Sequence, residues 1–296
     1  MATTTETSIR PSSSVLRDVI ALTKPRITLM VVITAAGGMW LAPDGLPLGR
    51  ALLMLLTTAA VVGAANALNC WLERDSDRLM ARTMKRPLPD GRLEPKIALW
   101  LGIALGLTSV PLLTFGVNAL TGLLGAIALV SYVAIYTPMK RASSVALLIG
   151  AVPGALPPLM GWTAATGSLD APGLALFAIL FFWQIPHFIA IALFRQADYD
   201  RAGLKTLPSE RGPQAAKVQA VVYTGLLVVS SLLLYVFRVA GVLYLATAIV
   251  LGILFFAASI ANLKPGVAPA KKLFFVSLIY LTLLFVALGL DTAIRA

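Results

Sequence analysis

Three side chains near the end of a long apolar run have the types and spacing of a metal-binding face. Asn69, Glu73 and Asp77 lie four residues apart, so on a helix turning ~100° per residue they fall within ~80° of one another. Asn66 joins this face, whereas Asp75 points largely away from it. Mg²⁺ prefers carboxylate and amide oxygens combined with phosphate oxygens of a substrate. The spacing therefore predicts a magnesium site at the end of a helix.

Basic side chains accompany this acidic face and could hold a diphosphate beside the metal. The six candidates are Lys24, Arg26, Arg82, Lys85, Arg86 and Lys140. Charges at a helix end can also simply mark the membrane–water boundary, and Lys140 could equally be a basic interfacial anchor. Asn66 and Asn69 favour the functional interpretation, because polar groups inside an apolar run are costly and tend to be functional.

A second polar group lies in the apolar run 173–194 and just beyond it. Gln184, His187, Arg195 and Asp198 fall within ~80° of one another if the helix continues regularly, although Pro186 could kink it. Asp198 is then a further candidate catalytic and metal-binding carboxylate. The sequence leaves open whether these groups reach the acidic face.

His187 is the only histidine of the chain and lies inside an apolar run. It could hydrogen-bond a neighbouring helix, or it could contact a polar or metal-bearing substrate. Trp183 lies one helical turn earlier, and packing is the simpler interpretation of its ring, with a stacking contact as the alternative.

The composition places these groups in a membrane protein. Hydrophobic residues make up 58% of the 296-residue chain and charged residues only 12%, with a mean hydropathy of +0.87. Soluble chains are roughly half apolar and about a quarter charged, so the bilayer must act as solvent. The net charge of +11 then reflects basic loops rather than a nucleic-acid partner. Cys70 is the only cysteine, which excludes an intrachain disulfide.

We expect an all-α polytopic bundle, because a spanning helix needs roughly 20 apolar residues. Nine candidate spans are present, at 27–43, 51–72, 97–115, 118–137, 144–164, 173–194, 216–237, 239–261 and 273–290. All but three of the 24 Lys and Arg residues then fall on one side, the exceptions being Arg50, Arg238 and Arg295. Positive charge marks the cytoplasmic side, so we expect a cytoplasmic N-terminus.

The expected organisation is a cytoplasmic segment 1–25 followed by one transmembrane domain, 26–292, with active-site loops 73–96 and 195–215. The D-x-D-R strings at 75–78 and 198–201 follow spans four helices apart, which suggests a duplicated four-helix unit plus one helix. The segment 150–163 holds three prolines and three glycines. Broken helices are tolerated where they line a cavity, so we expect this segment to border a substrate chamber.

Several strings together resemble a known family. They are LTKPRIT (22–28), D-x-D-R-x-M-x-R-T-x-x-R-P (75–87), YTPMKR (136–141), GAVPGALPPLMGW (150–162), WQIPHF (183–188) and DYDRAG (198–203). They are similar to the protohaem IX farnesyltransferases, the haem branch of the UbiA-type intramembrane prenyltransferases. The resemblance covers about residues 22–212. Its first motif maps onto Asn69, Glu73 and Asp77, with Glu73 where Asp is commoner. Its second motif is reduced to Asp198 and Asp200.

The resemblance implies transfer of a farnesyl group from farnesyl diphosphate to a vinyl group of haem B, with addition of water, giving haem O. It implies Mg²⁺ as cofactor and haem as a substrate rather than a cofactor. The haem contacts would be His187, Gln184 and Trp183. Expected partners are the lipid bilayer and proteins that handle haem or assemble oxidases.

Two other functions stay open. One is a prenyltransferase for an aromatic quinone precursor, and the other is a secondary transporter, since repeats and broken helices are also transporter features. The expected location is the bacterial inner membrane. The first 25 residues lack a signal-peptide core, while their Ser and Thr content leaves a mitochondrial inner-membrane location as the alternative.

Overall fold

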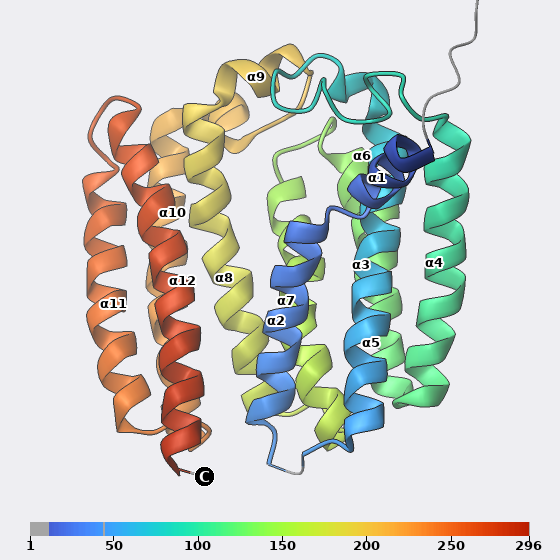
Figure 1. The fold of residues 1–296 in the computed structure, drawn as a ribbon. Coiled ribbons are helices and arrows are strands. Elements are labelled where there is room, and N and C mark those ends of the chain that lie inside the picture. Colours follow the sequence, from blue (N-terminus) through green and yellow to red (C-terminus); the bar gives the residue numbers. More distant parts are fainter. Residues whose placement is uncertain (1–11, 44, 296) are drawn as a thin grey trace, which may run out of the picture.

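The structure is a computed structural model that describes residues 12–43 and 45–295. Within these ranges the chain is helical apart from short connections (Figure 1). The helices are α1 (Ser12–Leu22), α2 (Pro25–Leu41), α3 (Leu48–Asp77), α4 (Pro95–Gly116), α5 (Ala119–Val130), the π-helix η1 (Ser131–Tyr136), α6 (Thr137–Met139), α7 (Ala146–Thr166), α8 (Ala171–Phe194), α9 (Gln196–Arg201), α10 (Leu207–Val236), α11 (Val242–Ala261) and α12 (Ala268–Arg295).

The helices confirm the predicted membrane bundle. Among the described residues, eight helices are long and apolar enough to cross a membrane, and a ninth span is present if α1 and α2, bent by 45° relative to each other, count as one. All nine predicted spans coincide with these helices. The fourth combines α5, η1 and α6 into one segment, Ala119–Met139. The predicted segment 1–25 lies partly outside the described residues, and its described part contains the whole of α1.

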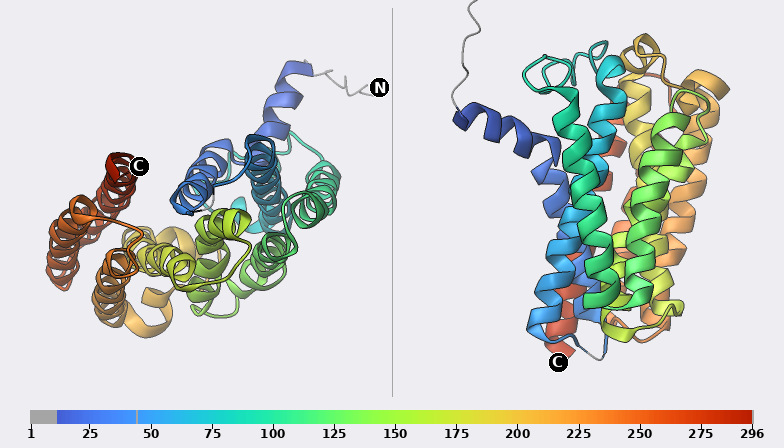
Figure 2. Two further views of the ribbon diagram at one scale, coloured as in Figure 1. Left: turned by 90° about the horizontal axis from the view of Figure 1, so that it is seen from below. Right: turned by 90° about the vertical axis from the view of Figure 1, so that its right-hand side faces the viewer.

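The spans pack into two hydrophobic cores that meet at α7. One core joins α2, α3, α4, α5 and α7, and the other joins α7, α8, α10, α11 and α12 together with the end of α2 at Leu41. Viewed along the bundle, the chain passes from the first group to the second through the central pair α7 and α8 (Figure 2). The two groups agree with a division of the chain into halves, while the suggested duplication stays a prediction.

Helices α2 and α7 approach closely enough that only glycine fits at two positions. A Cβ on Gly161 would lie 1.9 Å from the carbonyl oxygen of Ala35, and a Cβ on Gly38 would lie 1.9 Å from that of Pro158. Because these neighbours are backbone atoms, neither contact could be relieved by a side-chain rotation. Small residues let membrane helices pack closely in this way.

The connections at one end of the bundle form a cap, at the top of Figure 1, which we call the loop face. It contains α1, α6, α9 and the segment 78–94. Met80 packs against Ala202 and Leu204, and the Lys205 N–H donates to the Lys140 carbonyl at 2.7 Å. Connections that are distant in sequence are thereby held together over the ends of the spans.

The predicted loop 195–215 is largely helical. It contains α9 and the first turns of α10, whose helix begins at Leu207. A capping box at Thr206 and Ser209 starts α10, and Gly212 interrupts its helical geometry with φ 82°. The segment still connects the sixth and seventh spans, and its helix-start signals lie in a polar stretch before the apolar run.

Candidate active site

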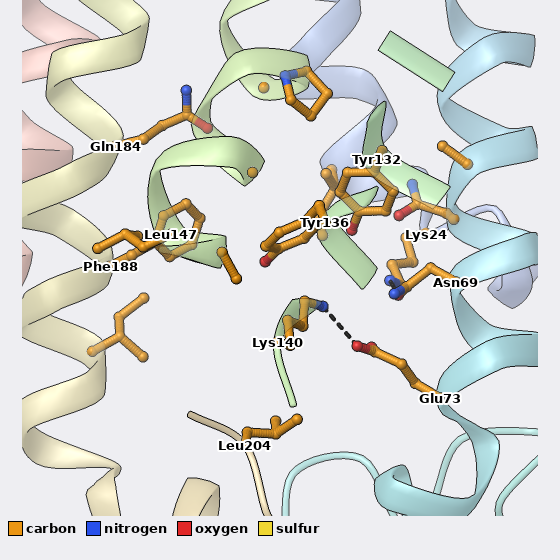
Figure 3. A pocket seen from close by; sticks show the side chains of 18 of the residues that line it. Lys24, Asn69, Glu73, Tyr132, Tyr136, Lys140, Leu147, Gln184, Phe188 and Leu204 are labelled. Atoms are coloured by element: carbon orange, nitrogen blue, oxygen red, sulfur yellow. Dashed lines mark hydrogen bonds and ion pairs between the residues drawn. The ribbon is translucent and has the colours of Figure 1, made fainter. Parts of the chain in front are cut away.

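A cavity of about 490 Å³ lies within the bundle and opens toward the loop face. Residues from α2, α3, η1, α7 and α8 line it, together with segments of the loop face. Its lining combines apolar residues, among them Ile27, Met30 and Pro157, with charged residues, of which Glu73 and Lys140 lie at the end nearest the loop face (Figure 3). The cavity therefore offers an apolar chamber with a charged mouth.

The acidic face lies at this mouth. Asn66, Asn69, Glu73 and Asp77 all line the cavity, because α3 continues as a helix to Asp77. The predicted helical geometry is confirmed here, as the side chain of Asp75 is 67% exposed and Asp75 is not part of the lining. Two carboxylates and two amides thus share one buried helical face.

Cations contact three of the four side chains of the acidic face. Lys140 Nζ lies 2.8 Å from Glu73 Oε1 (Figure 3). Arg86 Nη1 lies 2.7 Å from Asp77 Oδ2, and Lys24 Nζ donates to Asn69 Oδ1 at 3.0 Å. Residues from three separate segments therefore place positive charge against the acidic face.

Of the six basic candidates, the cavity brings four together. Lys24, Arg82, Arg86 and Lys140 line it, whereas Arg26 and Lys85 are exposed and do not. Sequence reasoning also missed Lys205, which lines the same mouth. Nothing in its sequence context distinguished it from other basic loop residues.

The π-helix η1 contributes two tyrosines that sequence reasoning did not select. Tyr132 and Tyr136 line the cavity, with ring centroids 5.1 Å apart, and Lys140 Nζ lies 4.4 Å from the centroid of Tyr136. Burial alone would lower the pKa of Lys140, but Tyr136 and Glu73 outweigh burial and raise the pKa above its usual value. Lys140 therefore carries a firm positive charge. Single-turn π-helices often occur at functional sites.

The predicted regular continuation of the helix beyond Phe194 is wrong. Helix α8 ends there, since Arg195 has non-helical φ and ψ of −117° and 16°. Asp198 consequently does not join the cavity lining and instead forms ion pairs with Arg195, at 3.6 Å, and with Arg201. Its neighbour Tyr199 lines the cavity instead, and burial raises the pKa of that phenol.

The three candidate haem contacts on α8 have different surroundings. Trp183 and Gln184 line the cavity. His187 is buried and lies outside the lining, with Nδ1 2.7 Å from Ser277 Oγ on α12. Its ring stacks on Trp183 at a centroid distance of 4.7 Å, and Trp183 Nε1 donates to the Ser277 carbonyl at 2.7 Å. Helix α12 thus fixes both rings.

The proline-rich segment borders the cavity, as predicted. Gly150, Pro153, Gly154 and Pro157 are all lining residues. The helix is not broken, however, because α7 runs continuously from Ala146 to Thr166 with its three prolines inside. Proline and glycine are tolerated in such helices where neighbouring groups satisfy the backbone.

One buried oxygen at the mouth suits a metal ion. Asp77 is 1% exposed, and its Oδ1 accepts no hydrogen bond from any residue that the structure describes. An unpaired buried carboxylate oxygen is costly, and a cation would satisfy it. No group of three or more His, Cys, Asp or Glu side chains able to hold a metal occurs in the described part of the chain. A metal here would need Asn69 and substrate oxygens beside Glu73 and Asp77, which fits Mg²⁺.

Solved structures share this fold. The chain superposes on digeranylgeranylglyceryl phosphate synthase with a TM-score of 0.81 at 19% identity, covering 94% of this chain and 98% of that one. It also matches a UbiA homologue from Archaeoglobus fulgidus bound to GPP and Mg²⁺, with a TM-score of 0.64 at 19% identity, covering 92% and 99% of the two chains.

Curated relatives are much more similar in sequence. The protoheme IX farnesyltransferase of Myxococcus xanthus is 53% identical, over 95% of this chain and 97% of the relative. That of Symbiobacterium thermophilum is 45% identical, over 95% of both chains. The model of the UbiA prenyltransferase family matches residues 31–286. The chain therefore belongs to the UbiA prenyltransferase family.

Proposed function

We propose that this protein transfers a farnesyl group from farnesyl diphosphate to a vinyl group of protohaem IX, with addition of water, to give haem O. The observation that carries the proposal is the acidic face of α3 with its paired cations at the mouth of an apolar cavity. The relatives named protoheme IX farnesyltransferase, at up to 53% identity over nearly their whole length, support haem as the acceptor.

The mouth would bind the diphosphate through cations that are already in place. Lys24, Arg86 and Lys140 now contact the acidic face, and each ammonium or guanidinium has further donors for phosphate oxygens. Mg²⁺, held by Asn69, Glu73 and Asp77, would neutralise charge on the departing diphosphate. The chain thereby stabilises the charge that develops as the carbon–oxygen bond breaks.

The inner cavity would hold the farnesyl chain among apolar side chains and exclude water from the cationic carbon. Tyr132 and Tyr136 stand between the mouth and this inner part. Their ring faces can stabilise positive charge, as aromatic faces do for cations generally. The vinyl group of haem would attack from the α8 side, where Trp183 and Gln184 line the cavity.

His187 remains a proposed haem contact through Nε2, because Nδ1 is engaged by Ser277. Asp198, paired with two arginines outside the cavity, is left out of the proposed metal site. Its place in the cavity is taken by Tyr199.

We also propose that the loop face is cytoplasmic and that the membrane is the bacterial plasma membrane. The segregation of basic residues at the loop face supports this orientation, and the series of long apolar helices suits a multi-pass protein. Proteins that deliver haem or receive haem O would then meet the protein at the membrane.

An acceptor panel tests the proposed function. The purified protein in liposomes is given farnesyl diphosphate and Mg²⁺ with either haem B or an aromatic quinone precursor, and products are identified by mass. A hydroxyethylfarnesyl adduct of haem B alone is expected. Transfer to the aromatic acceptor would instead support the quinone branch, and uptake of intact farnesyl diphosphate without diphosphate release would support a transporter.

A further inference from the structure

The side-chain amide of Gln184 is held in one orientation. Its Nε2 donates to the carbonyl oxygens of Leu180, at 3.0 Å, and Ala151, at 3.3 Å. Both partners are acceptors only, so the atom facing them must be the NH₂ group, and both of its hydrogens are used. The orientation of the amide is therefore determined by the two adjacent helices α7 and α8.

The other end of this amide is an acceptor without a donor. Among the residues that the structure describes, the hydrogen bonds of the Gln184 side chain all involve Nε2, and none reaches Oε1. It lies over Gly154, where an added Cβ would be only 2.0 Å away, and both residues line the cavity. Figure 3 shows the amide across the cavity from the charged mouth at Glu73. Because Gly154 has no side chain, the wall of the cavity has room for this oxygen.

Of the three reactants in the proposed function, only water can supply the missing donor. The farnesyl chain has only carbon-bound hydrogens. Haem has no N–H because iron occupies its ring nitrogens, and its carboxylates are acceptors. Diphosphate oxygens are acceptors too and belong at the mouth. Gln184 Oε1 remains accessible from the cavity, so a water molecule held there can donate a hydrogen bond to it.

We propose that Gln184 Oε1 holds the water that becomes the hydroxyl group of the product, an inference that rests on the proposed function. The farnesyl carbon–oxygen bond breaks with its electron pair on diphosphate, and the vinyl π pair forms the new carbon–carbon bond. Positive charge then resides on the carbon attached to the porphyrin. The water oxygen bonds to that carbon, and its surplus proton passes to the released diphosphate. No oxidant or reductant is needed.

The competing fate of the same cation makes the proposal testable. Without a positioned water, the cation loses a proton and gives an alkene lighter than the hydroxylated product by one water. In Gln184→Met, which keeps the chain length but removes the acceptor, we expect the ratio of hydroxylated to dehydrated product to fall about tenfold, the rate equivalent of one hydrogen bond. The ratio is measured by mass on whatever product forms, so it does not depend on the overall rate.

A second variant moves the acceptor without changing Gln184. Gly154→Ala places a methyl group where Oε1 now lies, so it should lower the product ratio in the same direction. Gly37→Ala is the matched control, since its Cβ meets only Phe285 at an ordinary 3.5 Å and Gly37 does not line the cavity. Its product ratio should equal that of the wild type.

The outcomes are distinct. Hydroxylated product alone from both Gln184→Met and Gly154→Ala would overturn the role of Gln184. Absence of any farnesylated haem from the wild type would overturn the proposed function instead. Should Gln184→Met fail to fold, Gly154→Ala alone decides.

Discussion

Lys140 Nζ and Glu73 Oε1 lie 2.8 Å apart although the residues are 67 positions apart in the chain. The pair joins the end of α3 to the segment that follows α6, so it closes one side of the cavity mouth. Each partner is mostly buried, with side chains 19% and 12% exposed. Removing one partner of a buried ion pair is strongly destabilising, because the other charge is left buried and uncompensated.

Replacing Lys140 should weaken binding of the diphosphate. In Lys140→Met we expect the Kd for a non-reactive farnesyl diphosphate analogue to rise about 10- to 100-fold, the loss of a charged hydrogen bond. Calorimetric titration of the protein in detergent measures this. Arg141→Met is the matched control, since Arg141 is exposed and does not line the cavity. Equal affinities in the two variants would refute a role for Lys140.

Removing the charge of either carboxylate on the acidic face should stop turnover without preventing insertion. Glu73→Gln and Asp77→Asn should each lower kcat by about 100-fold or more, the scale seen when a group stabilising the transition state is lost. Asp75→Asn, on the exposed side of the same helix, should retain activity. Rates of haem farnesylation in membranes with matched protein content provide the measurement. Near-normal rates for Glu73→Gln and Asp77→Asn would contradict the metal assignment.

The acidic face could be predicted from sequence because it depends on one regular helix. The spacing of Asn69, Glu73 and Asp77 fixes their relative directions wherever α3 lies. The same argument failed at Asp198, because it assumed that α8 continues past Arg195. Whether a helix ends at a given polar residue depends on the local backbone conformation and on the contacts of that residue. The sequence alone did not determine where α8 ends.

Other parts of the site depend on packing between distant segments. The contact of His187 with Ser277 joins the sixth and ninth spans, and the sequence pattern carries no information on which helices are neighbours. Tyr132 and Tyr136 lie on η1 and line the cavity, and which face of this span meets the cavity is decided by the helices packed around it. By contrast, the nine spans follow from hydropathy alone, since the bilayer requires long apolar helices.

The close approach of α2 and α7 predicts a stability effect at Gly161. In Gly161→Ala the new methyl group meets the Ala35 carbonyl, so the two helices must separate, at a cost of about 1–3 kcal/mol. The midpoint of thermal unfolding in detergent should fall. Gly289→Ala is the control, because a Cβ there meets nothing within 4 Å and alanine favours a helix interior by about 1 kcal/mol. A lower midpoint in Gly289→Ala than in Gly161→Ala would be contrary to this interpretation.

Helix α1 should hold the segment 78–94 in place through one ion pair. Arg92 Nε donates to both oxygens of Asp18, at 3.0 and 3.2 Å. Arg92→Gln and Asp18→Asn should each increase the rate of protease cleavage in this segment. Because the two residues act as one pair, the double variant should be cleaved no faster than either single variant. Cleavage rates at low protease concentration provide the measurement. Additive effects would show that the two residues act separately.

The most direct test of the central claim measures both products of one reaction. Wild-type protein in liposomes receives haem B and farnesyl diphosphate, with Mg²⁺ or with a chelator, and diphosphate and farnesylated haem are quantified in parallel. We predict equal amounts of the two products with Mg²⁺ and neither with the chelator, because Asn69, Glu73 and Asp77 would act through the metal. Farnesylated haem formed at the same rate in chelator, or diphosphate released without farnesylated haem, would contradict the account.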